Sequence, residues 1–242
     1  MSSDRPLRVL AMMPLFNEAH LLPNLISKLE DGLVDEFLAV NDGSTDGGPA
    51  MLREAGVTVI DQAGRAGVGA ALKRGVEYAR EHAYDVIVVM AGNGKDDPRE
   101  IPRLLAPILE DGADYVQGSR FLPGGESANL PTFRRHAIQL LSAGFQSYSA
   151  RECTDLTNGF RAYRISLLDD PEIDIAQPWL DTYEYEYYVH FKAYTLGYRV
   201  AEVAVSKTYP ASKRVSYSKI RPVVDWWKML RPFVLLGLGI KK

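Results

Sequence analysis

The sequence predicts one α/β domain in which helices flank a mostly parallel, Rossmann-like sheet. Apolar runs of strand length alternate with stretches of helical period through the first half of the chain, as they do in consecutive βαβ units. Of the 242 residues, 46% are hydrophobic, which suits a single domain with a substantial core. We expect this domain to span residues 1–210, and a basic, aromatic tail helix to span 211–242.

The expected elements of the first half follow one another closely. A buried first strand is expected at 8–15, and apolar residues spaced three or four apart then indicate a helix at 21–29. The other expected elements are strands at 37–40, 57–60 and 85–90, a short helix capped by Thr45 or Asp46, and a helix at 67–82. The last of these strands, DVIVVM, is typical of a central strand buried on both faces.

In the second half, a long loop separates the expected elements. Asp97 and Pro98 begin a helix, because proline in the first turn has no hydrogen bond to lose. Residues 121–131 are rich in glycine, proline, serine and asparagine, and predict a surface loop of the kind that carries function. The other expectations are a strand at 115–118, a helix near 134–150, an irregular stretch at 154–163, a helix at 182–196 and a strand at 198–205.

The composition argues against several classes of protein. The chain carries 28 basic and 31 acidic residues, and the net charge of -3 argues against binding nucleic acid through its phosphates. Cys153, the single cysteine, cannot form an internal disulfide. The start of the chain lacks the apolar stretch of a secretory signal. The longest apolar run, 233–240, is far shorter than the roughly 20 residues that span a bilayer. We therefore expect a cytoplasmic protein.

Polar and glycine-rich segments follow the expected strands, at the sheet edge where open α/β proteins bind ligands. They occupy 14–18, 41–46, 65–75 and 91–98. Each segment alone has a structural interpretation: 41–46 is also a turn with a helix cap, and Gly67 and Gly69 lack the full G-x-G-x-x-G pattern. Their order and spacing favour a binding site.

Six ordered segments resemble the family 2 glycosyltransferases of the GT-A fold: PLFNE, NDGSTDG, RAGVGAALKRG, VVMAGNGKDDPREIPRLL, GADYVQGSRFLPGG and TDLTNGFRAYR. The resemblance covers nearly the whole chain. It is strongest to the branch of dolichol-phosphate mannose synthases and bacterial polyprenyl-phosphate glycosyltransferases. It implies an inverting hexosyltransferase that moves a sugar from a UDP- or GDP-sugar to a polyprenyl phosphate or a saccharide.

The resemblance also implies a nucleotide-sugar site made from several strand ends. Asp42 is implied to accept a hydrogen bond from the base, and a carboxylate suits an N–H of uracil or of guanine. The nucleotide-sugar residues expected are Pro14, Asn17, Glu18, Asp42, Ser44, Gly69, Lys73 and Asn93.

The sequence departs from the family where carboxylates of an Asp-x-Asp motif usually hold a divalent cation, Mg²⁺ or Mn²⁺, against the donor diphosphate. Ala91 and Asn93 stand at these positions; alanine cannot ligate a metal, and an amide oxygen is a poorer ligand than a carboxylate. A metal held by Asn93 and Asp96, or by Asp96 and Asp97 from shifted positions, is one alternative. In another, the ammonium of Lys95 acts catalytically by stabilising the departing diphosphate. In the third, Lys95 is a solvated loop residue.

On the acceptor side, the resemblance implies that arginines bind the acceptor phosphate, because a planar guanidinium matches its oxygens. The acceptor residues expected are Arg120, Arg134, Arg161 and Lys213, and Arg120 and Asp155 are also expected to be catalytic. A phosphate acceptor is already ionised and needs no strong base, whereas a saccharide hydroxyl does. Candidate bases are Asp155, Asp181, Glu184 and Glu186; the alternative for 179–188 is an aromatic helix packed on the sheet.

The tail mixes basic with aromatic residues, among them Trp226, Trp227 and Lys228. This mixture suits a helix on a membrane surface, a homodimer contact or a helix docked on the domain. Two other functions stay open. One is a non-catalytic nucleotide-sugar binding protein with a degenerate metal site, supported by Ala91. The other is a nucleotidyltransferase, although no glycine-rich phosphate loop follows the first strand.

Overall fold

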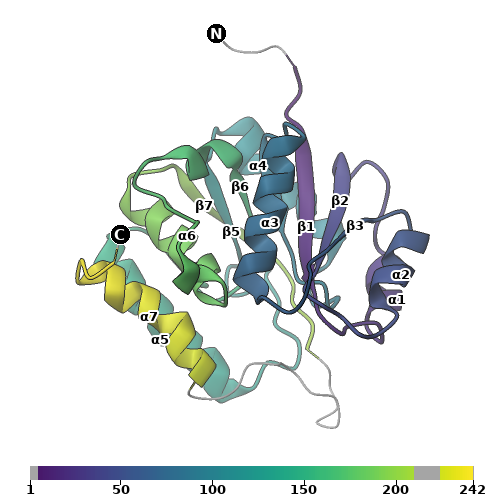
Figure 1. The fold of residues 1–242 in the computed structure, drawn as a ribbon. Coiled ribbons are helices and arrows are strands. Elements are labelled where there is room, and N and C mark those ends of the chain that lie inside the picture. The colour runs from purple at the N-terminus through teal and green to yellow at the C-terminus, as the bar shows by residue number, and fades with distance from the viewer. Residues whose placement is uncertain (1–4, 210–223, 242) are drawn as a thin grey trace.

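A seven-stranded sheet forms the middle layer of the structure, a computed structural model that describes residues 5–209 and 224–241 (Figure 1). The strand order is β3-β2-β1-β4-β6-β5-β7. Neighbouring strands are parallel except around β6, which runs antiparallel to both β4 and β5. The mostly parallel sheet that the sequence predicts is therefore confirmed. The strands are β1 (Val9–Leu15), β2 (Glu36–Asn41), β3 (Thr58–Asp61), β4 (Val86–Val89), β5 (Tyr115–Ser119), β6 (Arg161–Arg164) and β7 (Val200–Ala204).

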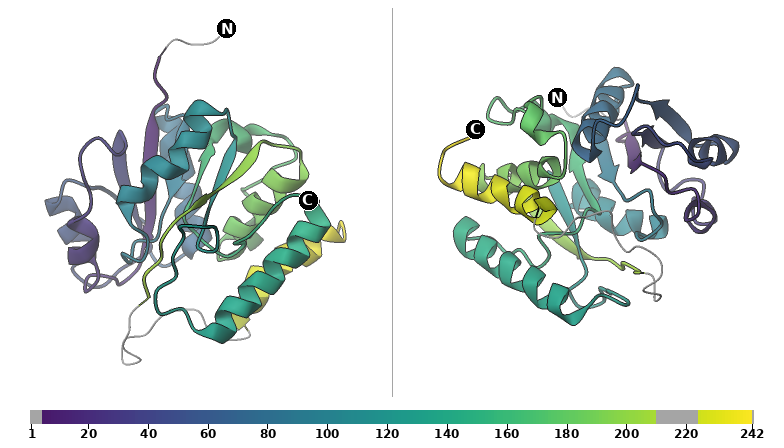
Figure 2. Two further views of the ribbon diagram at one scale, coloured as in Figure 1. Left: turned by 180° about the vertical axis from the view of Figure 1, so that it is seen from behind. Right: turned by 60° about the horizontal axis from the view of Figure 1, so that its bottom comes forward.

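Helices cover both faces of this sheet (Figures 1 and 2). Helices α3 and α6 pack on one face, and α1, α2 and α4 pack on the other. The helices are α1 (Leu22–Ile26), α2 (Gly48–Glu54), α3 (Val68–Glu81), α4 (Ile101–Glu110), α5 (Thr132–Ser149), α6 (Glu184–Thr195) and α7 (Val224–Gly237). Short 3₁₀ turns lie at Pro98–Glu100, Ile165–Asp169 and Pro178–Leu180.

The core is divided by the sheet into two halves because successive strand side chains point to opposite faces. In β1, Leu10 and Met12 join the half beneath α3 and α6. Val9, Ala11 and Met13 join the half beneath α1, α2 and α4. All of these side chains are buried, as expected for a strand near the centre of an α/β sheet.

The structure differs from the sequence prediction most clearly at 154–163. Part of this stretch forms β6, which pairs through Ala162 with Val88 of β4 and Val116 of β5. The strand reads RAYR and lacks an apolar run, so its position in the sheet is not visible in the sequence. Its arginines find backbone acceptors instead: the guanidinium of Arg164 donates to the carbonyl oxygen of Ile108 at 2.7 Å.

A cluster of buried polar side chains lies between the sheet and α6 and contains Tyr115, Cys153, Arg161 and His190. The Tyr115 hydroxyl accepts from Arg161 at 2.9 Å and lies 3.1 Å from Nδ1 of His190. The thiol of Cys153 lies 3.7 Å from the other ring nitrogen of His190. Burial raises the pKa of the Cys153 thiol and lowers the pKa of His190, because it disfavours the charged form of each group. Both groups are therefore neutral near pH 7.

Helix α7 packs on α6 and lies beside α5 (Figure 2). The rings of Phe233 and Phe145 have centroids 5.1 Å apart, and Arg231 forms a 2.6 Å ion pair with the buried Glu184. Among the tail alternatives, the described part of the tail is therefore a helix docked on the domain. No helix in the described ranges is both long and apolar enough to cross a membrane.

Candidate active site

A cavity of about 1150 Å³ lies at the carboxyl ends of β1, β2 and β4. One wall is polar and comes from the loops that follow these strands. A second wall is largely apolar and comes from α5 and α7; its apolar side chains are Phe133, Ala137, Ile138, Leu141, Met229 and Leu230, and its basic side chains are Arg134 and Lys228. The cavity is therefore placed where open parallel sheets bind ligands, and it combines a polar with an apolar side.

Asp42 stands at the end of β2 and lines the polar wall. Its carboxylate accepts from the backbone N–H groups of Ala66 at 2.6 Å and Gly67 at 3.0 Å. The neighbouring Arg65 lies over the ring of Phe16, 4.2 Å from its centroid. Backbone dipoles thus hold the Asp42 carboxylate at the edge of the cavity, beside a planar cation and an aromatic ring.

The other expected nucleotide residues divide into those that line the cavity and those that shape its loops. Pro14, Glu18 and Asn93 line it. Asn17 and Ser44 instead join the loops after β1 and β2, since the N–H of Asn17 donates to the Ser44 hydroxyl at 3.1 Å. Asn17 has a left-handed backbone, with φ of 51°, a conformation that asparagine tolerates better than most residues.

Gly69 and Lys73 hold the start of α3 against the segment that precedes α6. A Cβ atom at Gly69 would lie 1.9 Å from the carbonyl oxygen of Leu180, so only glycine fits this contact. Lys73 pairs with Asp181 at 2.6 Å and donates to the Gln177 carbonyl at 2.8 Å. The structure therefore gives both residues a packing role next to the cavity, and neither is among the residues that line it.

The loop after β4 carries Lys95 and Asp96 into contact with Lys207, which follows β7. Asp96 is buried; it accepts from the N–H of Ala91 at 2.8 Å and from the ammonium of Lys207 at 2.6 Å. Lys95 and Lys207 both line the cavity. Burial, and then the like charge of Lys207, lower the pKa of Lys95. Lys95 is therefore a part-buried cavity residue and not a solvated loop residue.

These residues do not fit the divalent cation that the resemblance implies. Ala91 offers no side-chain ligand, and Asn93 offers a neutral amide oxygen that accepts from the N–H of Lys95 at 3.3 Å. One oxygen of Asp96 is bound to a backbone N–H and the other to Lys207. Within residues 5–209 and 224–241, no group of three or more His, Cys, Asp or Glu side chains is placed to hold a metal ion.

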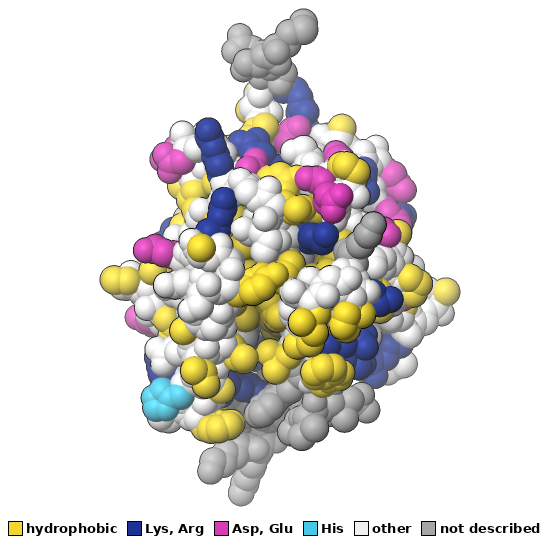
Figure 3. All heavy atoms as spheres, turned by 90° about the vertical axis from the view of Figure 1, so that its left-hand side faces the viewer, with side chains coloured by type: hydrophobic (Ala, Val, Ile, Leu, Met, Phe, Trp, Pro, Cys, Tyr) yellow, Lys and Arg dark blue, Asp and Glu magenta, His cyan; other side chains and the backbone are white. Residues whose placement is uncertain are grey.

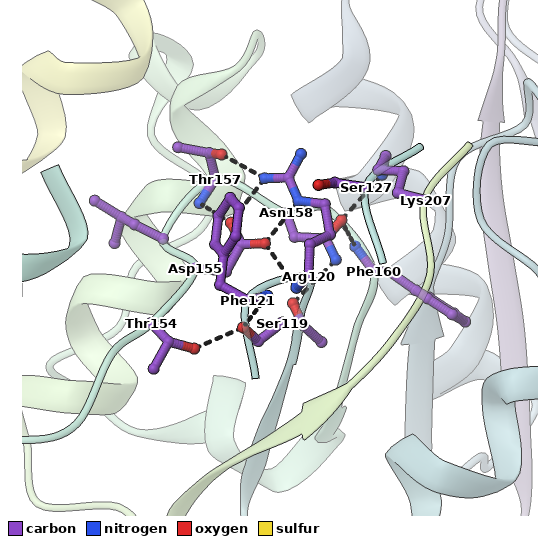
Figure 4. A network of polar contacts seen from close by, with 12 residues as sticks. Ser119, Arg120, Phe121, Ser127, Thr154, Asp155, Thr157, Asn158, Phe160 and Lys207 are labelled. Carbon is purple, nitrogen blue, oxygen red and sulfur yellow. Dashed lines mark hydrogen bonds and ion pairs between the residues drawn. The ribbon is translucent and has the colours of Figure 1, made fainter. Parts of the chain in front are cut away.

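Arg120, which lines the cavity, forms a buried ion pair with Asp155 (Figure 4). Nε and Nη2 of Arg120 each donate to a different oxygen of Asp155 at 2.7 Å. Arg120 also donates to the hydroxyls of Thr157 and Tyr209. Because the Asp155 side chain is 0% exposed and both its oxygens face Arg120, it fits a positioning role better than the role of a base.

Among the other candidate bases, only Glu186 lines the cavity. Asp181 is paired with Lys73, and Glu184 is buried against Arg231. A Glu186 oxygen lies 3.8 Å from the guanidinium of Arg161. Glu186 is therefore the carboxylate of this set that faces the cavity.

The expected acceptor residues also separate in the structure. Arg120 and Arg134 line the cavity, the latter from the first turn of α5. Arg161 is fully buried and donates to the carbonyls of Asn158 and Glu186. It therefore holds the backbone of these segments in place and does not line the cavity itself. Lys213 lies outside the described residues.

Lys207 lines the cavity but is not among the site residues that the sequence predicts. It is 111 positions from Asp96, and in the sequence it looks like one member of a basic stretch near the tail. The signal that finds it is structural: an isolated antiparallel bridge pairs Asp96 directly with Lys207.

Comparison with known proteins identifies relatives of this chain. Residues 11–171 match the family model of glycosyl transferase family 2. The chain is 32% identical to undecaprenyl-phosphate mannosyltransferase of Micrococcus luteus over 206 aligned residues. The alignment covers 83% of each chain. It is also 32% identical over 216 residues to polyprenol monophosphomannose synthase of Mycolicibacterium smegmatis, covering 83% of this chain and 77% of the relative.

The fold also has a solved counterpart. The structure is similar to that of glucosyl-3-phosphoglycerate synthase from Mycobacterium tuberculosis, with a TM-score of 0.66 and 20% identity over 96% of this chain and 79% of the other. This likeness shows a GT-A-like α/β fold. With a family match over more than half of its length, the chain belongs to glycosyltransferase family 2 and is an enzyme of that family.

Proposed function

We propose that this enzyme moves a sugar from a nucleoside diphosphate sugar to a polyprenyl phosphate, with inversion at the anomeric carbon. The main support for this proposal is that one cavity contains both a cationic region and an apolar wall. Lys95, Arg120, Arg134 and Lys207 supply the cations, while α5 and α7 supply the apolar side chains. An acceptor with an anionic head and an isoprenoid chain matches this combination.

The donor is proposed to bind at the end of the cavity where Asp42 stands. The Asp42 carboxylate, held by two backbone N–H groups, has lone pairs left for an N–H of uracil or guanine. The diphosphate then extends towards the loop after β4, where Lys95 lies. This placement brings the anomeric carbon to the region between the two walls.

The transfer step needs positioning more than proton removal. An oxygen of the acceptor phosphate, already ionised near neutral pH, forms a bond to the anomeric carbon. The bond from that carbon to the β-phosphate oxygen breaks, and the nucleoside diphosphate leaves with the electron pair. Arg134 holds the acceptor phosphate, and the Arg120–Asp155 pair fixes the wall beside it. The cations offset the charge that develops on the leaving group.

Apolar side chains on α5 and α7 also support a lipid acceptor. Phe133 and Leu140 of α5 are 71% and 76% exposed, and Trp227 of α7 is 54% exposed. Figure 3 shows hydrophobic side chains gathered across the middle and lower part of one face, with Lys and Arg side chains beside them. Such a surface suits contact with the membrane that would contain the acceptor. The names of the two curated relatives also point to undecaprenyl phosphate and polyprenol phosphate chemistry.

A saccharide acceptor is the second candidate, and Glu186 is the observation that favours it. A saccharide hydroxyl must lose a proton, and Glu186 is a cavity-lining carboxylate placed to take it. Glu186→Gln separates the two candidates, because it removes the base but keeps the shape. Full turnover of a polyprenyl phosphate by this variant supports the phosphate acceptor. Turnover of a saccharide by the wild type that is abolished in Glu186→Gln favours the saccharide.

The test incubates the purified enzyme with UDP-, GDP- and dTDP-sugars and undecaprenyl phosphate in vesicles, and measures lipid-linked sugar. We expect product with the phosphate and none with undecaprenol, which lacks it. Arg134→Ala should lower kcat/KM for the lipid about ten- to hundred-fold, with donor affinity unchanged, because a charge-assisted hydrogen bond is lost. Equal turnover of undecaprenol, or normal kinetics of Arg134→Ala, would contradict the proposal.

A further inference from the structure

We propose that Lys95 and Lys207 together bind the diphosphate of the donor, in the place where related enzymes hold a divalent cation. In this arrangement, Asp96 has become the residue that positions Lys207. The inference rests on the proposed function, since it takes the donor to carry a diphosphate.

Two side-chain oxygens hold the ammonium of Lys207. Its ammonium lies 2.6 Å from Oδ1 of Asp96 and 3.0 Å from Oδ1 of Asn158, and its side chain is only 11% exposed. An ammonium has three N–H donors, and these two oxygens take two of them. Since Lys207 also lines the cavity, a third N–H remains to donate to an anion bound there.

The backbone brings the two lysines to the same place. Asp96 and Lys207 form a β-bridge, and the N–H of Thr208 donates to the carbonyl oxygen of Lys95 at 3.1 Å. Lys207 is thus one member of the bridged pair, Lys95 is next to the other member, and both lysines line the cavity. A short strand contact fixes their spacing more firmly than two independent loops would.

The charges around the lysines favour an anion. Arg134 adds a third positive charge to their surroundings, and two carboxylates, those of Glu18 and Asp96, oppose these three cations. Asp96 is already neutralised by Lys207, and Ala91 brings no charge where a metal ligand would stand. A diphosphate carries about two to three negative charges, and lysine ammonium groups are established phosphate ligands. The site is therefore built for the diphosphate itself and not for a cation that would bridge to it.

The experiment measures binding of UDP, GDP and inorganic pyrophosphate by calorimetry, in excess EDTA and with Mn²⁺. For the wild type we expect the same affinity in both buffers. Lys207→Met should weaken binding about ten- to hundred-fold in EDTA, and Lys207→Arg should retain most of the affinity because it keeps the charge. Lys95→Met should show a loss of the same order.

Two further variants separate binding from folding. Lys207→Met leaves Asp96 buried without its partner, so the double variant Asp96→Asn, Lys207→Met removes both charges. If Lys207 binds the diphosphate, the double variant is as weak a binder as Lys207→Met. If Lys207 only neutralises Asp96, the double variant regains wild-type affinity and the proposal is overturned. Lys28→Met is the matched control, because Lys28 pairs with the neighbouring Asp97 outside the cavity and its loss should leave affinity unchanged.

The outcomes also distinguish this inference from the proposed function. Loss of wild-type UDP and GDP binding in EDTA, with recovery in Mn²⁺, overturns the two-lysine site and leaves the glycosyl transfer proposal intact. If the wild type binds neither nucleotide nor pyrophosphate in either buffer, both proposals are wrong.

Discussion

Asp42 and Asp96 are both buried carboxylates at the ends of parallel strands, and they are satisfied in different ways. Asp42 follows β2 and accepts from the backbone of the turn before α3. Asp96 lies in the loop after β4 and accepts from one backbone N–H and from the ammonium of Lys207. The Asp42 carboxylate is held by backbone dipoles, and the Asp96 carboxylate is paired with the ammonium of Lys207.

This difference decides what each residue presents to a ligand. Backbone N–H groups stabilise the Asp42 carboxylate without cancelling its charge, so its oxygens can accept further hydrogen bonds. The charge of Asp96 is cancelled by Lys207, and the group that faces the cavity is then the lysine. One position presents an acceptor of hydrogen bonds to the cavity, and the other, through its partner, presents a cation.

The largest effect is expected from Asp96→Ala. The change leaves Lys207 buried without its counter-ion and the N–H of Ala91 without an acceptor. We expect the free energy of unfolding to fall by about 3–5 kcal/mol, measured by urea denaturation. In Asp169→Ala, which breaks the exposed pair with Arg80, the fall should be less than about 1 kcal/mol. Similar values for the two variants would mean that the Asp96 pair does not stabilise the fold.

Asp42→Ala should weaken binding of the nucleotide base and leave binding of the diphosphate unchanged. Loss of the carboxylate leaves the N–H of the base unpaired, at a cost of about 1–3 kcal/mol in UDP or GDP binding. Pyrophosphate has no base, so its affinity should be unchanged. Calorimetry with both kinds of ligand checks this. An equal loss for pyrophosphate would show that Asp42 shapes the whole cavity instead of contacting the base.

The smallest effect is expected from Ser44→Ala, in the loop that carries Asp42. The hydroxyl of Ser44 accepts from the N–H of Asn17, so its removal should cost about 0.5–1.5 kcal/mol of unfolding free energy. Nucleotide affinity should change little, since Ser44 is not among the residues that line the cavity. Ser27→Ala, which removes an exposed hydroxyl, is the control. A large loss of nucleotide affinity would instead make Ser44 a direct ligand.

Much of the fold is visible in the sequence because it depends on local pattern. The apolar run of β4 and the helical period of α4 identify those elements without knowledge of their neighbours. The strand β6 is different: Arg161 and Arg164 are accommodated by carbonyl groups from distant segments, and no local rule predicts that. Strand assignment fails where tertiary partners replace apolar character.

The site shows the same division. Motif resemblance places Asp42, Lys95 and Arg120 at the cavity, and the structure finds them on its walls. Motifs name residue types but do not say which way a side chain points, so they do not show that Asp155 is enclosed by Arg120 or that Arg161 lies behind the wall. The place of Lys207 in the cavity depends on its contact with Asp96, which is 111 positions away, and a single sequence does not reveal such a contact.

Cys153 makes the enzyme convenient for chemical labelling. It is the one cysteine in the sequence, it is buried beside His190, and burial raises the pKa of its thiol. Since the thiolate is the reactive form, maleimide reagents should leave the native protein unmodified. A cysteine introduced at the exposed Leu140 of α5 would then be the sole reactive thiol. A polarity-sensitive fluorophore attached there would test the proposal that α5 contacts a bilayer.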